Sequence, residues 1–121
     1  MTDPNIRRLG ATPRMSNAVV HNGTVHLSGQ VAITHRGGDV DDQIREVLER
    51  IDTLLTEAGS SRAQLLTAQL LLSDMAILPR LNEQWDQWIE PGCAPTRTTI
   101  QTVLASPAYA LEIAVTAAVV G

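Results

Sequence analysis

The stretch "YALEIAVTAAVV", residues 109–120, is an apolar run of strand length with one charged residue, Glu112. It contains no glycine or proline, so we expect a β-strand, whose alternate residues face opposite sides of a sheet. Glu112 then shares its face with Ala114, Thr116 and Ala118, and the larger apolar residues share the other. Moving an ionised, unpaired carboxylate out of water costs several kcal/mol of free energy. Glu112 must therefore contact water, pair with a cation or take part in a reaction.

Two amphipathic patterns precede this strand and predict helices. Residues 37–61 carry apolar side chains at helical spacing, with Asp39 or Asp41 available to cap the start and Gly59 to end the helix. Residues 77–92 carry a second apolar stripe. There Pro79 fits the first turn and Pro91 stops the helix.

The remaining patterns predict strands and complete an α+β fold. Asn22-Gly23 separates two β-rich runs and indicates a hairpin. Residues 65–74 are a strand candidate whose unbroken leucines also fit a helix, and a Thr-rich β run follows Pro95. The order β-β-α-β-α-β-β predicts a single domain, residues 1–121, with both helices on one face of a mixed sheet. The small residues around Glu112 on the other face suit close approach by another subunit, so we expect an oligomer.

Composition excludes several classes of function. The chain has 121 residues, a net charge of −4 and no basic cluster, which argues against nucleic acid as a partner. No apolar run reaches membrane length, and "MTDPNIRRLG" lacks an apolar signal core. The single Cys93 excludes an internal disulfide and fits a reducing compartment, so we expect a cytoplasmic protein. All nine cationic residues are arginine, which excludes lysine Schiff-base chemistry.

Arg97 is the second candidate for chemistry, because a guanidinium can bind a carboxylate through two hydrogen bonds. The alternative is a surface arginine at a strand start. If the chain reverses near residues 106–107, Glu112 faces Gln101 and Arg97 lies roughly 13 Å further along, too far for a direct pair. The two charges could instead flank a small ligand, with a neighbouring chain closing the site.

Other polar residues give weaker signals. Ser28 and Gly29 in "LSGQ" could approach a ligand or simply end a strand, and the context is not that of a hydrolase nucleophile. The three histidines (His21, His26 and His35) show no metal-binding spacing, so we expect no metal site. Asn82 is the one polar residue on the second helical stripe and would need hydrogen-bond partners.

Four segments, "LSGQVA", "LNEQWDQW", "PTRTTIQTVL" and "LEIAVTAAV", together resemble the RidA (YjgF/Rid) family of imine and enamine deaminases along essentially the whole chain. The resemblance implies a chorismate-mutase-like fold and a homotrimer with ligand sites in clefts between subunits. It also implies hydrolysis of 2-imino and 2-amino-enoic acids to 2-oxo acids and ammonia, without a metal or organic cofactor.

The resemblance also implies roles for individual residues. The family's carboxylate-binding arginine falls on Arg97 and its water-holding glutamate on Glu112. Its site Ser-Gly falls on Ser28 and Gly29, and its helix asparagine on Asn82.

Two positions depart from the well-studied deaminases, which have a tyrosine where this chain has Met15 and a cysteine where it has Thr99. These differences leave two alternatives open. One is a non-catalytic trimer that binds a small carboxylate or a protein, and the other is a pathway-specific hydrolase on the same scaffold.

Overall fold

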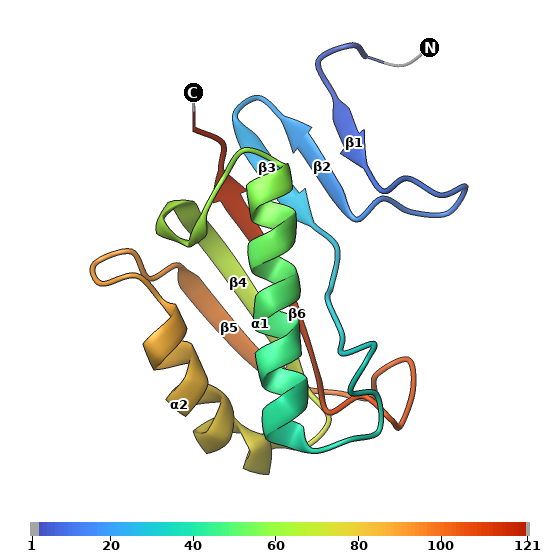
Figure 1. Ribbon diagram of the computed structural model, residues 1–121, viewed down its shortest axis with the longest axis vertical. Coiled ribbons are helices and arrows are strands. Elements are labelled where there is room, and N and C mark those ends of the chain that lie inside the picture. The colour runs from blue at the N-terminus through green and yellow to red at the C-terminus, as the bar shows by residue number, and fades with distance from the viewer. Residues whose placement is uncertain (1–2, 121) are drawn as a thin grey trace.

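The computed structural model describes residues 3–120 and has two layers, a six-stranded sheet and two helices (Figure 1). The helices are α1 (Val40–Glu57) and α2 (Leu78–Trp88), and two short 3-10 turns lie at Arg62–Gln64 and Met75–Ile77. The strands are β1 (Arg7–Leu9), β2 (Ala18–His21), β3 (Thr24–Leu27), β4 (Leu65–Leu72), β5 (Thr96–Gln101) and β6 (Leu111–Ala118). Both helices cover the same face of the sheet, so the expected α+β architecture is confirmed. Strand β1 is an addition that the sequence did not indicate.

Strand β6 lies in the middle of the sheet, whose order is β1-β2-β3-β6-β4-β5. The strands β4 and β5 are parallel, and every other neighbouring pair is antiparallel. Along β6 the buried residues alternate with half-buried ones, as expected, and Glu112 belongs to the half-buried set. The buried set is Leu111, Ile113, Val115 and Ala117. We call the sheet face that carries Glu112 the open face, because neither helix covers it (Figure 1).

Helix α1 begins and ends where the sequence predicts. The Asp39 side chain caps it by accepting a hydrogen bond from the Asp41 backbone N–H at 3.1 Å. Gly59 follows its last turn with a φ of 85°, a left-handed conformation that glycine adopts without strain. The buried residues of α1 form one stripe against the sheet: Gln43, Ile44, Val47, Leu48, Ile51 and Leu55. The predicted Asn22-Gly23 turn joins β2 to β3, and both residues have positive φ.

The expected approach of the last two strands to each other is wrong. Strand β5 pairs with β4 in parallel, and β4 separates it from β6. Glu112 therefore lies opposite Leu71 of β4, not opposite Gln101. Because β5 and β6 are not neighbours, the chain must pass the end of β4, and residues 102–110 form a connection longer than a tight turn.

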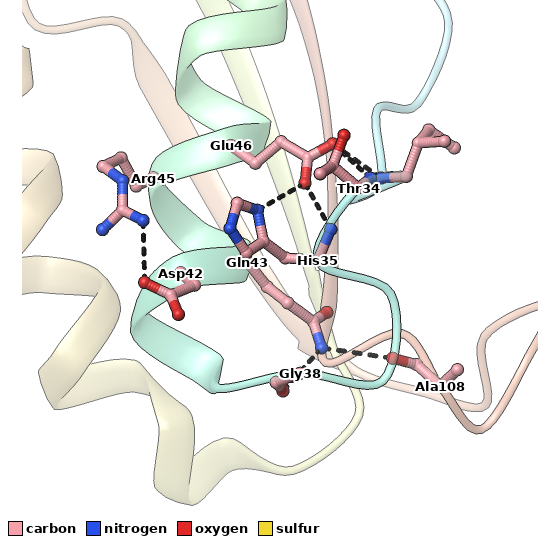
Figure 2. A network of polar contacts seen from close by, with 9 residues as sticks. Thr34, His35, Gly38, Asp42, Gln43, Arg45, Glu46 and Ala108 are labelled. Carbon is pink, nitrogen blue, oxygen red and sulfur yellow. Dashed lines mark hydrogen bonds and ion pairs between the residues drawn. The ribbon is translucent and has the colours of Figure 1, made fainter.

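Two side chains of α1, Glu46 and Gln43, form hydrogen bonds with the backbone of the loop that follows residue 32 (Figure 2). The Glu46 carboxylate accepts hydrogen bonds from the backbone N–H groups of Ile33, Thr34 and His35 at 2.7–2.9 Å. The Gln43 amide donates to the carbonyls of Gly38 and Ala108. Within residues 3–120, no helix is long and apolar enough to cross a membrane.

Candidate functional site

Glu112 lies against Gly29 on the open face of the sheet. A β-carbon added to Gly29 would overlap the Glu112 carboxylate, so only glycine leaves that carboxylate in its place. The two residues come from neighbouring segments, since Gln30 forms a β-bridge with Ile113 next to Glu112. Gly29 precedes that bridge and Glu112 adjoins it. The structure therefore brings together two residues that the resemblance assigns to one site.

Ser28 adjoins this pair and is held by three hydrogen bonds. Its backbone N–H donates to the Asn17 carbonyl at 2.9 Å. Its carbonyl and hydroxyl oxygens both accept from the Gln30 side-chain amide, at 3.0 and 3.1 Å. We call Ser28, Gly29 and Glu112 the acid cluster.

Arg97 is exposed at the start of β5 and leans on α2. Its Nη1 donates to the Asn82 side-chain oxygen at 2.8 Å, and its guanidinium carbon lies 5.6 Å from the centre of the Trp85 ring. Trp85 is itself buried and tilted against Trp88, with ring centres 5.4 Å apart. Within residues 3–120 no carboxylate forms an ion pair with Arg97. The guanidinium is thus positioned but not neutralised, which suits recognition of an anionic ligand.

The two departures from the family pattern lie apart from each other. Thr99 is on β5, two residues after Arg97 and therefore on the same face of the strand. Met15 is half exposed in the loop between β1 and β2, where its backbone N–H and carbonyl bond the Thr12 side chain. We call Arg97, Asn82 and Thr99 the arginine cluster, and Met15 belongs to neither cluster.

Within one chain the two clusters face opposite sides of the sheet. Arg97 is in register with Ala68 of β4, which is buried beneath the helices, whereas Glu112 is in register with Leu71 on the open face. The register also separates them by three residues and two strand spacings, roughly 14 Å between Cα atoms. Arg97 and Glu112 of the same chain therefore do not form one site.

Shifted pKa values are found for two carboxyl groups outside the acid cluster, Glu46 and Asp41. Burial acts to raise the pKa of Glu46, but the three backbone N–H donors and the His35 ring outweigh it and lower the pKa to about 2. A hydrogen bond from Arg80 lowers the pKa of the exposed Asp41 against a smaller effect of burial. Residues 3–120 contain no group of three or more His, Cys, Asp or Glu side chains that could hold a metal ion.

A cavity of about 380 Å³ lies beside α1 and includes neither Arg97 nor Glu112. Its lining contains Asn17, Gln30, Thr34, Glu46, Glu49, Arg50, Thr53 and Leu54. This cavity therefore does not bring the two candidate charges together.

Two residues that contact the candidate site were not identified from the sequence. Trp85 fits the apolar stripe of α2 and so predicts only core packing, although it also contacts Arg97. Gln30 is the last residue of the "LSGQ" segment. The sequence does not indicate that it is buried, because its burial depends on the packing of this segment against α1. Asn82 does find the hydrogen-bond partner that its position requires, and this partner is Arg97.

Comparisons with known proteins agree with this architecture. The family model described as endoribonuclease L-PSP matches residues 5–119. A RutC family protein of Haemophilus influenzae is 36% identical over 112 residues, covering 93% of this chain and 97% of the relative. The RutC family protein YoaB of Escherichia coli is 35% identical over 114 residues, covering 94% and 98%. A crystal structure of a YjgF family member from Neisseria meningitidis superposes with a TM-score of 0.91 at 38% identity, covering 96% of each chain.

Proposed function

The chain belongs to the RidA (YjgF/RutC) family, whose model carries the description endoribonuclease L-PSP, and on that premise we propose that it hydrolyses 2-imino and 2-amino-enoic acids. The products are a 2-oxo acid and ammonia. The main observation behind the proposal is that Arg97 is oriented by Asn82 and Trp85 without being neutralised by a carboxylate. The same chain places the Glu112 carboxylate against Gly29 in a second location.

We further propose that each site is shared by two chains of a homotrimer. The arginine cluster and the acid cluster face opposite sides of one sheet, so one chain cannot supply both to a single ligand. In a ring of identical subunits, however, each interface joins two different surfaces of the same chain. The open face carries small residues beside Glu112, such as Ala114, which permit close approach of another subunit.

In such a site Arg97 binds the substrate carboxylate and thereby orients the adjacent C=N carbon. Glu112 holds a water molecule and accepts its proton as the oxygen attacks that carbon. Because the substrate reacts as the iminium ion, the resulting carbinolamine has a neutral amino group, which takes the proton from Glu112. Ammonia then leaves as the hydroxyl proton passes to Glu112 and the C=O bond of the 2-oxo acid forms. The ammonia takes this proton and departs as ammonium, which restores the Glu112 carboxylate. An iminium carbon is already electrophilic, so the reaction needs no covalent nucleophile.

A second candidate is a trimer that binds a small carboxylate without turning it over. Thr99 beside Arg97 and the half-exposed Met15 favour it, because both differ from the residues of the well-studied deaminases. RNA cleavage, which the family description suggests, fits poorly with a net charge of −4. The single Cys93 suits a reducing compartment, and our proposal places the protein in the cytoplasm.

The decisive experiment measures loss of a 2-imino acid that an amino-acid oxidase generates in situ, with semicarbazide trapping the remainder. Wild type is compared with Arg97→Ala, both verified as folded oligomers. We expect the wild type to accelerate imine loss and the variant to lose that acceleration. A folded wild type that accelerates no imine, with small or large side chains, would favour the carboxylate-binding candidate.

A further inference from the structure

Gln30 is one of only two buried polar side chains within residues 3–120, with 3% of its surface exposed. Its amide oxygen accepts a hydrogen bond from Arg50 Nε of α1 at 3.2 Å. Its amide nitrogen donates to the carbonyl oxygen of Ser28 at 3.0 Å and to the Ser28 hydroxyl at 3.1 Å. The side chain therefore links the helical layer to the acid cluster.

The direction of these hydrogen bonds follows from chemistry. A guanidinium can only donate, so the Gln30 group facing Arg50 must be the amide oxygen. The NH₂ group of the same amide must then face Ser28. A carbonyl can only accept, which agrees with the bond to the Ser28 backbone oxygen. The Ser28 hydroxyl consequently accepts from Gln30 and keeps its own proton for a different partner.

Gln30 also fixes the position of Gly29. Its backbone exchanges two hydrogen bonds with Ile113, at 2.8 and 3.1 Å, directly beside Glu112. Its side chain holds the Ser28 carbonyl on the other side of Gly29. The glycine that leaves room for the Glu112 carboxylate is therefore held from both ends by one residue.

We propose that Gln30 is a positioning residue of the site, oriented by Arg50. It sets the Ser28 hydroxyl as a donor and holds Gly29 against Glu112. This inference rests on the proposed function for its kinetic consequence, but its hydrogen-bond geometry can be tested separately.

The kinetic test compares Gln30→Glu with Gln30→Met in the imine assay. Glutamate keeps the length of the side chain and its bond to Arg50, but it cannot donate to Ser28 when ionised and repels the Ser28 carbonyl. We expect kcat/KM to fall about tenfold or more in both variants, the equivalent of losing one or two buried hydrogen bonds. A Gln30→Glu enzyme within about twofold of wild type would overturn the inference.

Gln43 provides a matched control, because it is similarly buried and its amide nitrogen also donates two hydrogen bonds, in this case to the carbonyl oxygens of Gly38 and Ala108. We expect Gln43→Met to lower the melting temperature while kcat/KM of the folded enzyme stays near that of wild type. Equal kinetic losses in the Gln30 and Gln43 variants would reduce Gln30 to a purely structural role.

Arg50 supplies a test that leaves the buried amide in place. Arg50→Lys retains a donor for the Gln30 oxygen, whereas Arg50→Met removes it and leaves the amide free to turn over. We expect the lysine variant to retain activity and the methionine variant to lose it. Equal activity in the two variants would contradict the orienting role of Arg50.

A neutron structure of the wild-type protein separates this inference from the proposed function. We expect both amide deuterons on the Gln30 atom that faces Ser28, and the Ser28 deuteron directed away from Gln30. A Ser28 deuteron directed at Gln30 would overturn the inference even in an active enzyme. A protein that hydrolyses no imine but shows the expected deuterons would refute the proposed function alone.

Discussion

The Asn82 side-chain oxygen accepts a hydrogen bond from Arg97 Nη1 at 2.8 Å, across the contact between α2 and β5. This bond orients a guanidinium that would otherwise be a free surface group. It leaves the charge of the guanidinium intact, because a carboxamide is neutral. The same position on α2 therefore controls both the geometry and the charge of the proposed carboxylate-binding group.

Replacement of Asn82 separates these two effects. We expect Asn82→Ala to raise KM for the imino acid about fivefold, since one positioning hydrogen bond contributes about 1 kcal/mol. Asn82→Asp introduces a carboxylate that pairs with Arg97 and competes with substrate, so KM should rise further. Steady-state kinetics at several substrate concentrations measure both values. Unchanged KM in both variants would exclude Arg97 as the carboxylate-binding group.

Trp85 and Trp88 allow a matched comparison, because both are buried on α2 and only Trp85 stacks on Arg97. Trp88 stacks on Arg62 instead. We expect Trp85→Phe to raise KM by a few-fold, since a weaker cation–π contact loses about 0.5–1 kcal/mol. Trp88→Phe should lower stability without changing KM. The reverse pattern would show that the Trp85 ring only fills the core.

Gly29→Ala tests the close approach of the glycine to Glu112. The added methyl group must displace the carboxylate, which is the flexible end of its side chain. We expect kcat to fall about tenfold or more, because a displaced base loses its contact with water, while KM stays near the wild-type value. Gly38→Ala is the control for crowding, because this glycine also lacks a positive φ and its added methyl group would lie 3.0 Å from the His35 carbonyl oxygen, not against Glu112. A normal kcat in Gly29→Ala would argue against Glu112 as the base.

Complementation tests whether each site draws on two chains. In the proposed homotrimer we expect Arg97→Ala and Glu112→Ala chains to be inactive alone, whereas every mixed trimer would contain one interface with both native residues. Co-refolding equal amounts should restore about a quarter of wild-type activity in a closed three-subunit ring. The imine assay on the mixture measures this recovery. Absence of recovery in verified mixed trimers would place both residues in one chain's site.

The lowered pKa of Glu46 predicts acid sensitivity of the loop that follows residue 32. A carboxyl whose pKa falls from 4.5 to about 2 on folding stabilises the native state fully above pH 4.5. That stabilisation is lost as the pH falls from 4.5 towards 2. Glu46→Gln should cost about 1–3 kcal/mol at neutral pH, because the amide loses charge-assisted hydrogen bonds. Denaturant unfolding from pH 7 to pH 3 should show the difference from wild type shrinking. A constant difference would mean that the carboxylate contributes no pH-dependent stability.

Much of the secondary structure could be predicted from the sequence because the patterns that specify it involve residues close together in the chain. The apolar period of α1, the cap at Asp39 and the alternation around Glu112 each depend on residues adjacent in sequence, and the structure confirms each. Strand β1 was missed because three residues carry too short a pattern, and it exists only through pairing with β2.

Local sequence patterns were enough to predict the helices, the longer strands and the Asn-Gly turn, and they singled out Arg97 and Glu112 as unusual charges. The position of β4 between β5 and β6 could be learned only from the folded chain, because strand order depends on long-range pairing that no local pattern specifies. That order places the arginine and acid clusters on opposite faces of one sheet. It also buries Gln30 between Arg50 and Ser28, because a polar side chain is buried only where the fold supplies its hydrogen-bond partners.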